Sequence, residues 1–190
     1  MAHLSIIGTG NMSQAIAAVA AKGGHSVQQL GEGDSAPVAG DVVILAVPYP
    51  AVADVIAKRG EQLAGKVVVD ITNPLNFETF DSLVVPADSS AAAEIAAALP
   101  QSNVLKAFNT TFAGTLAAGT VGPLTTTVLI AGDDADAKAT LAGIFTSGGL
   151  KVVDAGGLKR ARELEAVGFL QLSLAANEKV SWTGGFGLVA

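Results

Sequence analysis

Residues 1–27 read MAHLSIIGTGNMSQAIAAVAAKGGHSV, and the glycine loop GTGNMS within this stretch decides the fold. The apolar run His3–Ile7 predicts a strand, and the alanine-rich run Asn11–Lys22 predicts a helix. Gly8 permits the tight turn between them, and Gly10 permits a phosphate group to approach the backbone closely. The first N–H groups of the helix would point at that phosphate. The stretch therefore predicts the start of a dinucleotide-binding βαβ unit.

Ser13 occupies the third position of this glycine fingerprint, where glycine or alanine is usual. That position requires only close packing of the helix against the strand. Serine is little larger than alanine, and its hydroxyl can form a local hydrogen bond or reach a phosphate. A glycine pair alone is a weak signal of dinucleotide binding. The strand before the loop and the helix after it strengthen the prediction, because they are the structural context that such a site requires.

The same alternation of β-branched and alanine-rich runs continues along most of the chain. It is typical of an α/β fold, a Rossmann-type doubly wound parallel sheet with a short C-terminal helical segment. The expected strands are His3–Ile7, Ser26–Leu30, Val42–Val47, Val67–Ile71, Val104–Phe108, Thr126–Ala131 and Lys151–Asp154. The expected helices are Asn11–Lys22, Pro50–Leu63, Ser90–Leu99, Ala135–Ser147 and about Lys159–Lys179. A glycine pair predicts a division into a dinucleotide-binding domain, residues 1–157, and a segment, residues 158–190, that completes an acceptor site or a dimer contact.

Composition excludes several classes of function. The net charge of −6 over 190 residues argues against nucleic acid as a partner, because phosphates would be repelled. The absence of cysteine excludes disulfides, thiolate nucleophiles and Cys-ligated metals, and we expect no metal site. Apolar stretches are too short or too interrupted to cross a bilayer, and no targeting segment is recognisable. We therefore expect a cytoplasmic protein that does not act at a membrane.

The connection between the second and third expected strands, residues 31–41, is too short for a crossover helix. It should be an open loop that leaves the adenosine end of a cofactor less enclosed than usual. Glu32 and Asp34 lie where a carboxylate binds the ribose 2′-hydroxyl of NAD, and the loop has no Arg or Lys for the 2′-phosphate of NADP. These residues favour NAD, while the alternative that both acids are solvated loop residues stays open.

Side chains that move protons are scarce. His3 and His25 fall at the edge of the sheet opposite the expected ligand crevice, and we interpret both as structural. Tyr49 is more plausible as a cover over the cofactor than as a proton donor. Lys106 is either an amine with a shifted pKa near the nicotinamide or, more simply, the partner of a neighbouring acid. We assign no catalytic residue, because hydride exchange between a nicotinamide and a flavin-like ring depends mainly on orientation.

Four separated segments carry a family resemblance. They are IIGTGNMSQAIA with GGHSV, DVVILAVPYPAV, GKVVVDITNPLN with PADSSAAAEIAAALP, and VLKAFNTTFA followed by VLIAGDDADAK and VVDAGGLKRARELE. Together they resemble the NADPH-dependent coenzyme F-420 (deazaflavin) reductases. They are also similar to the predicted dinucleotide-binding oxidoreductases and to the cytosolic reductase domain of the STEAP ferric reductases. The resemblance covers essentially the whole chain and implies hydride transfer between NADP(H) and a flavin-like or deazaflavin acceptor.

The resemblance also implies cofactor-binding positions. The glycine loop would hold the pyrophosphate, the AVPYP loop the adenosine side, and the TNP and AFNT motifs the nicotinamide end. With the loop residues after the second strand, the expected set is Gly8, Thr9, Gly10, Asn11, Met12, Gly31, Glu32, Ala46, Val47, Pro48, Tyr49, Asn73, Pro74, Ala107, Asn109 and Thr110. Family members usually have Ser-Arg or Ser-Lys after the second strand, where this chain has Glu32 and Gly33. NADP, the usual cofactor of the family, and NAD therefore both remain open.

Two alternative functions remain. GTGNMSQAI also resembles the start of the pyrroline-5-carboxylate reductases, although residues 158–190 are short for the helical domain of such an imine reductase. The second alternative is a dinucleotide sensor without turnover.

In the last segment, Trp182 and Phe186 would cover the acceptor ring or contact a second subunit in a homodimer. Arg160 and Arg162 would meet an acidic substrate tail or simply be solvated.

Overall fold

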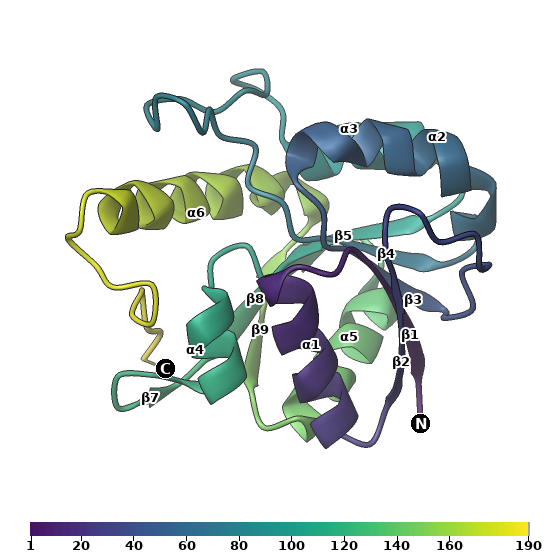
Figure 1. Cartoon of the computed structure of the whole chain (residues 1–190), viewed down its shortest axis with the longest axis horizontal. Coiled ribbons are helices and arrows are strands. Elements are labelled where there is room, and N and C mark those ends of the chain that lie inside the picture. Colours follow the sequence, from purple (N-terminus) through teal and green to yellow (C-terminus); the bar gives the residue numbers. More distant parts are fainter. Residues whose placement is uncertain (190) are drawn as a thin grey trace.

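Figure 1 shows the computed structural model, which describes residues 1–189 around a seven-stranded sheet of order β2-β1-β3-β4-β5-β8-β9. The strands of this sheet are β1 (His3–Ile7), β2 (Ser26–Leu30), β3 (Val42–Leu45), β4 (Val67–Asp70), β5 (Asn103–Ala107), β8 (Thr127–Gly132) and β9 (Lys151–Gly156). A separate hairpin joins β6 (Thr120–Val121) and β7 (Leu124–Thr125). The helices are α1 (Asn11–Lys22), α2 (Val52–Leu63), α3 (Ala91–Ala98), α4 (Ala113–Ala118), α5 (Ala135–Ser147) and α6 (Ala161–Ala176), with 3₁₀ turns at Tyr49–Ala51 and Leu158–Arg160.

Helices cover both faces of the sheet, which confirms the doubly wound fold class (Figure 1). One core contains side chains of α1, α4 and α5, with Ile16 and Phe145 fully buried against β1, β3, β4, β5 and β8. The other contains side chains of α2 and α3, with Leu63 and Ile95 packed against the opposite face. The strands between these layers are nearly continuous apolar runs because both of their faces are buried.

The sheet is parallel, as expected from the sequence, except for one pairing near its edge. Strands β1 to β5 are parallel, but β8 pairs antiparallel with β5, and β9 pairs parallel with β8. The β8–α5–β9 unit therefore runs in the opposite direction to the rest. A strand that is buried on both faces has the same apolar sequence in either direction, so its composition does not show its orientation.

Several boundaries also differ from the sequence expectations. The third strand ends at Leu45, Pro50 lies in a 3₁₀ turn before α2, and the last helix ends at Ala176. Helix α4 and the β6–β7 hairpin were not expected, because elements of this length carry too little periodicity to be recognised. Residues 31–41 form an open loop without a helix, as predicted.

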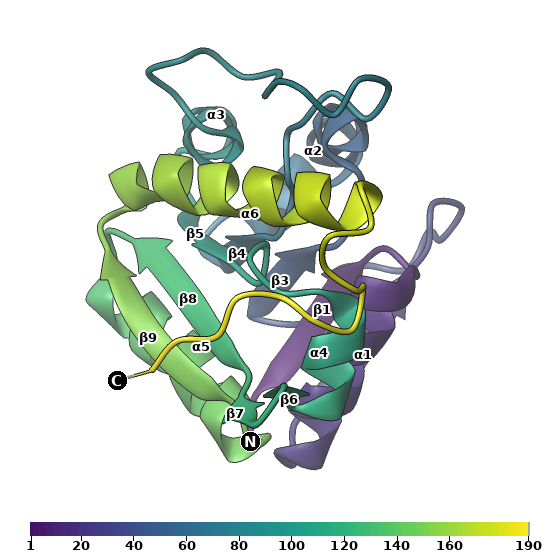
Figure 2. The ribbon, with the colours of Figure 1, turned by 90° about the vertical axis from the view of Figure 1, so that its left-hand side faces the viewer.

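Helix α6 lies across the loops that follow β4 and β5. Its Leu164 carbonyl accepts a hydrogen bond from Asn109 Nδ2 at 2.8 Å, and its Gln171 Nε2 donates to the Thr110 carbonyl at 3.3 Å. Figure 2 shows α6 crossing the molecule and the chain after it descending past α4. The backbone N–H of Phe186 holds that tail by donating to Gln171 Oε1 at 2.9 Å. Within residues 1–189, none of the helices is both long and apolar enough to cross a membrane.

Candidate functional site

The strand order places a crevice at the carboxyl ends of β1 and β3. The chain continues from β1 to β2 on one side and then to β3 on the other, and ligands of such sheets bind where the order reverses. Gly8 leaves β1 with a φ of 123°, and a Cβ there would lie 2.1 Å from the Ala46 carbonyl oxygen. Glycine is therefore required at this position by conformation and by space alike.

The first turn of α1 faces this crevice with its backbone N–H groups uncapped, at the positive end of the helix dipole. Gly10 is its N-cap, no side chain caps the helix, and the first turn has no acidic residue. A Cβ at Gly10 would meet no atom within 4 Å, so packing does not require glycine there. Uncapped N–H groups at a helix N-terminus form an anion site, and the close approach allowed by Gly10 fits a diphosphate.

Ser13 of α1 stabilises the glycine loop through a hydrogen bond to its backbone. Its hydroxyl is buried, donates to the Gly8 carbonyl at 2.6 Å and accepts a hydrogen bond from Gln29 Nε2 at 2.8 Å. Of the two roles that the sequence allowed, the local hydrogen bond is the one that the structure shows. Serine at this position therefore joins the glycine loop to α1 and β2 by hydrogen bonds.

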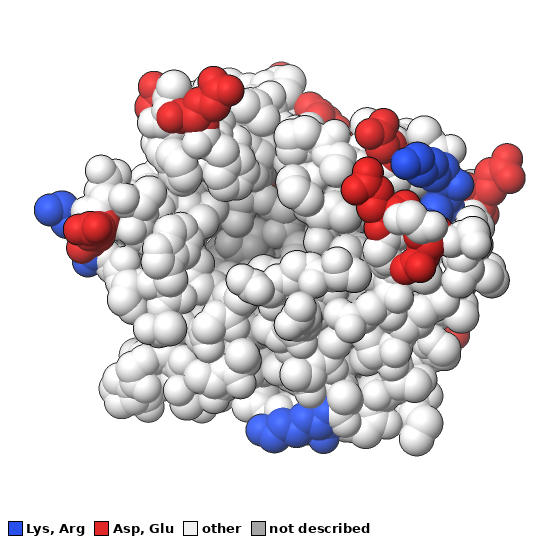
Figure 3. Space-filling view, in the orientation of Figure 1, with Lys and Arg blue, Asp and Glu red and all other residues white. Residues whose placement is uncertain are grey.

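Two cavities flank the glycine loop. The first, here called the glycine-loop cavity, has a volume of about 300 Å³ and is lined by Ile7, Gly8, Thr9, Gly10, Leu30, Gly31, Glu32, Ala46, Val47, Pro48, Ala51, Asp54, Val55, Lys58 and Arg59. The second, here called the apolar cavity, has a volume of about 500 Å³ and is lined by Asn11, Met12, Ile71, Asn73, Phe108, Asn109, Thr111, Phe112, Ala113, Gly114, Leu172, Trp182 and Thr183. Figure 3 shows a hollow surrounded by uncharged residues between α1, α4 and α6.

No residue lining the apolar cavity, among residues 1–189, has a titratable side chain. Aromatic rings form much of the wall, and Trp182 packs on Phe112 with ring centroids 5.1 Å apart. Phe108 is fully buried at a φ of 65°, which is a strained conformation for a bulky residue. Such strain persists only where the surrounding structure enforces it, and it occurs preferentially at ligand sites. The cavity suits a planar apolar ring.

Asn73 and Asn109 are hydrogen-bonded polar residues of this cavity, which Asn11, Thr111 and Thr183 also line. Asn109 Nδ2 donates to Asn73 Oδ1 at 3.0 Å, and Asn73 Nδ2 donates to the Asn109 carbonyl at 3.1 Å. Asn109 Oδ1 is buried and has no hydrogen-bond partner, which is unusual for a buried polar atom. A Cβ at Gly168 would lie 2.2 Å from Asn73 Oδ1, so only glycine lets α6 approach this pair.

A buried ion cluster lies beneath the site. The Lys106 ammonium contacts Asp70 Oδ2 at 2.8 Å and Glu165 Oε1 at 2.9 Å, and all three side chains are fully buried. Glu165 also accepts hydrogen bonds from the backbone N–H groups of Ala91 and Ala92 at the start of α3. Burial raises the pKa of the Glu165 carboxyl, and the Lys106 ammonium opposes that rise. Lys106 is thus the partner of neighbouring acids, the simpler of its two predicted roles.

The structure brings together most of the residues expected to bind the cofactor. The glycine-loop cavity contains Gly8, Thr9, Gly10, Gly31, Glu32, Ala46, Val47 and Pro48, and the apolar cavity contains Asn11, Met12, Asn73 and Asn109. Four expected residues line neither cavity. Pro74, Ala107 and Thr110 are buried. The fourth, Tyr49, lines a separate groove between α2 and α3.

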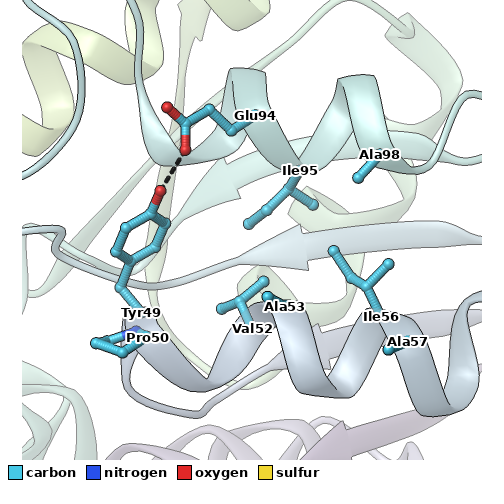
Figure 4. A pocket seen from close by; sticks show the side chains of 9 residues that line it. All are labelled: Tyr49, Pro50, Val52, Ala53, Ile56, Ala57, Glu94, Ile95 and Ala98. Carbon is cyan, nitrogen blue, oxygen red and sulfur yellow. Dashed lines mark hydrogen bonds between the residues drawn. The ribbon is translucent and has the colours of Figure 1, made fainter.

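Tyr49 faces this groove, which has a volume of about 440 Å³, and its hydroxyl donates to Glu94 of α3 (Figure 4). Burial and the hydrogen bond to Glu94 raise the pKa of the Tyr49 hydroxyl, which disfavours its ionisation. The tyrosine therefore links the 3₁₀ turn before α2 to α3, and it lines neither of the two cavities.

Both histidines lie at the opposite edge of the sheet from the cavities. His25 Nδ1 accepts a hydrogen bond from the Ala2 backbone N–H at 3.0 Å, and its Nε2 lies 3.0 Å from Ser147 Oγ. His3 is exposed at the start of β1. Their positions agree with the structural role predicted from the sequence.

Sequence reasoning missed several lining residues. Lys58 and Arg59 of α2 reach the glycine-loop cavity, although both are far in sequence from the loop after β2. Phe108 belongs to the AFNT motif but was not among the expected residues, and Leu172 reaches the apolar cavity from α6. Only the AFNT motif offered a sequence signal, because the other contacts depend on how α2 and α6 pack.

A doubly wound sheet with an open glycine loop at the crevice where the strand order reverses, followed by a ring-sized apolar cavity, defines a Rossmann-type dinucleotide-binding oxidoreductase. Comparison with known proteins identifies the family. The family "NADP oxidoreductase coenzyme F420-dependent" matches residues 26–74. The F420-dependent NADP reductase of Methanocaldococcus jannaschii is 32% identical over 157 residues, which are 80% of this chain and 70% of that protein.

Two further relatives agree. A crystal structure assigned as an F420-dependent NADP reductase from Arthrobacter sp. FB24 matches over 100% of both chains, with a TM-score of 0.85 and 25% identity. The metalloreductase STEAP3 of Rattus norvegicus is 36% identical over 112 residues, 59% of this chain but 22% of that protein. The chain belongs to the F420-dependent NADP oxidoreductase family. This membership confirms the predicted resemblance, the fold class and the oxidoreductase class.

Proposed function

We propose that this protein transfers hydride between NADPH and a deazaflavin of the F420 type. The observation that carries the proposal is the apolar cavity next to the glycine loop, whose described lining has aromatic, aliphatic, amide and hydroxyl side chains but no titratable one. Hydride exchange between two stacked rings requires close approach and orientation, which such a cavity supplies. The relatives from Methanocaldococcus jannaschii and Arthrobacter are named as F420-dependent NADP reductases, which supports the same acceptor.

The residues present fit NADPH. The N–H groups at the start of α1 would bind the diphosphate, and the Asn73–Asn109 pair would hold the nicotinamide end. The unpartnered Oδ1 of Asn109 is suited to a carboxamide N–H, the donor that a nicotinamide offers. When bound, the nicotinamide supplies the hydride. The protein's residues orient the ring and exclude water from the apolar cavity.

The C-terminal segment, residues 158–190, forms the acceptor side of the site in this proposal; residue 190 lies outside the described structure. Leu172 of α6 and Trp182 and Thr183 of the tail line the apolar cavity, opposite Met12 of the glycine loop. Reduction of an imine would in addition require a proton donor at the imine nitrogen. The described lining offers none, which favours a ring acceptor whose proton exchanges with water.

Assembly as a homodimer in the cytoplasm completes the proposal. Val167 and Leu170 on the outer side of α6 are exposed, as is Leu188 of the tail. Exposed apolar side chains of this kind are what a second copy would cover in a dimer. Light scattering of the wild type and of Leu170→Ser would test this part, and a monomeric wild type would contradict it.

Hydride transfer is tested with purified protein, NADPH or NADH as donor, and F420, FMN, FAD or a ferric chelate as acceptor. We expect NADPH to reduce F420, seen as loss of the visible absorbance of the oxidised deazaflavin. Trp182→Ala should raise the KM for F420 with little effect on NADPH binding. Phe77→Ala is the matched control, because Phe77 is 54% exposed and Trp182 53% exposed, but Phe77 lines neither cavity. NADPH binding without turnover of any acceptor would contradict the proposal and favour a dinucleotide sensor.

A further inference from the structure

Two basic side chains of α2, Lys58 and Arg59, line the glycine-loop cavity together with Gly31 and Glu32. The loop after β2, residues 31–41, has no lysine or arginine of its own. Because that loop contains no helix, α2 is the helix that borders this end of the cavity. Figure 3 shows basic side chains among acidic ones on the side of the molecule where α2 lies in Figure 1.

Arg59 donates hydrogen bonds to the loop after β2, and its partners there are backbone carbonyls rather than a carboxylate. Its Nη1 donates to the Ala36 carbonyl at 2.8 Å, and its Nη2 donates to the Asp34 carbonyl. Both acceptors are neutral, and a guanidinium has five N–H donors, so donors remain for an anion. The Asp34 carboxylate is engaged within its own loop, where it accepts a hydrogen bond from the Gly31 N–H at 2.6 Å.

Lys58 is exposed at the same cavity. Among residues 1–189, neither Lys58 nor Arg59 has a carboxylate within ion-pairing distance. Glu32 and Asp54 also line the cavity, so both signs of charge are present. A carboxylate is the group that recognises a ribose 2′-hydroxyl, and a nearby cation is the group that accommodates a 2′-phosphate. Selection between NAD and NADP therefore depends on which of these groups meets the ribose.

We infer that Lys58 and Arg59 form the subsite for the 2′-phosphate of the adenosine ribose, and that they, rather than Glu32, decide between NADP and NAD. The inference rests on the proposed function for the placement of the adenosine end in the glycine-loop cavity. A phosphate monoester carries close to two negative charges and accepts several hydrogen bonds, which two unpaired cations satisfy. Helix α2 thus provides the cations that the short loop after β2 cannot provide.

The test is calorimetric titration with 2′,5′-ADP, which has the 2′-phosphate, and with 5′-AMP, which lacks it. The wild type should bind 2′,5′-ADP about tenfold or more tightly than 5′-AMP. Lys58→Ala should remove most of this preference and leave the affinity for 5′-AMP unchanged. Lys22→Ala, which removes the same charge at the far end of α1, should behave as the wild type. Thermal denaturation of each variant verifies that it is folded.

Arg59→Lys separates charge from loop support, because lysine keeps the charge but cannot donate to both loop carbonyls. It should retain part of the preference for 2′,5′-ADP. A wild type that does not prefer 2′,5′-ADP, or a Lys58→Ala variant that keeps the full preference, overturns the inference. If the preference holds but no ring acceptor is reduced, the proposed function fails and this subsite stands.

Discussion

Replacing Lys106 with methionine tests the buried ion cluster that joins β4, β5, α3 and α6. Methionine keeps the apolar stem and removes the ammonium, which leaves the fully buried Asp70 and Glu165 facing each other without a counter-charge. The loss of one partner of a buried ion pair costs about 3–5 kcal/mol. A drop of roughly 2–4 °C in Tm per kcal/mol is usual for a domain of this size, so Tm should fall by roughly 6–20 °C.

The loss should depend on pH with a defined sign. Burial raises the pKa of Glu165 in the folded state, and an acid with a raised folded-state pKa stabilises the fold at low pH. That contribution is lost as pH rises from the ordinary carboxyl range through the raised value. Without Lys106 the pKa rises further, since the opposing ammonium is gone. Lys106→Met should therefore lose more stability at about pH 8 than at about pH 5.

Urea denaturation followed by circular dichroism at both pH values measures this difference. The control is Lys138→Met, because Lys138 contacts Asp154 at the same distance, 2.8 Å, at the surface, where the aspartate side chain is 59% exposed. Exposed pairs contribute at most about 1 kcal/mol, so this variant should stay close to the wild type. The reasoning is refuted if Lys106→Met loses no more stability than Lys138→Met, or if its loss is the same at both pH values.

Three further predictions concern backbone approach and the groove. Gly8→Ala should lower both Tm and NADPH affinity, because its Cβ would collide with the Ala46 carbonyl. Gly10→Ala should keep the wild-type Tm and lose only NADPH affinity. Equal Tm values for the two variants in differential scanning fluorimetry would contradict this. Gly168→Ala should push α6 outward and raise the KM for the acceptor more than that for NADPH, and steady-state kinetics with an unchanged acceptor KM would refute it. Tyr49→Phe should leave the Kd for NADPH within about twofold in a fluorescence titration, because Tyr49 lines neither cavity; a larger loss would place it at the cofactor.

Local sequence was sufficient for the elements around the glycine loop. The strand β1, the helix α1 and the strand β2 have the bounds expected from the sequence, and residues 31–41 are the open loop that their length predicted. Each of these features depends on neighbouring residues: apolar periodicity, glycine conformation and the length of chain that a crossover needs. The same stretch also indicated the edge of the sheet where both cavities lie.

Features that depend on packing between distant segments were not accessible in this way. The orientation of β8 is not encoded in a run that is buried on both faces, and short elements such as α4 have too few residues for a periodic signal. Tyr49 lies in the segment that follows β3, as a cofactor contact would, yet the helical turn that it begins directs its ring to α3. Sequence distance therefore placed Tyr49 near the site without indicating the direction of its side chain.

The amino-acid sequence by itself determined the fold class, the glycine loop, the shortage of proton-moving groups and the family resemblance, because these follow from local conformation and residue type. Only the tertiary structure decided which side chains meet: Lys106 with two acids, Lys58 and Arg59 at the cavity of the glycine loop, and α6 over the Asn73–Asn109 pair. The physical reason is that ion pairing between side chains and the close packing of a helix on its neighbours both depend on distances in space. Such distances between residues far apart in the chain are set by the packing of helices on both faces of the sheet.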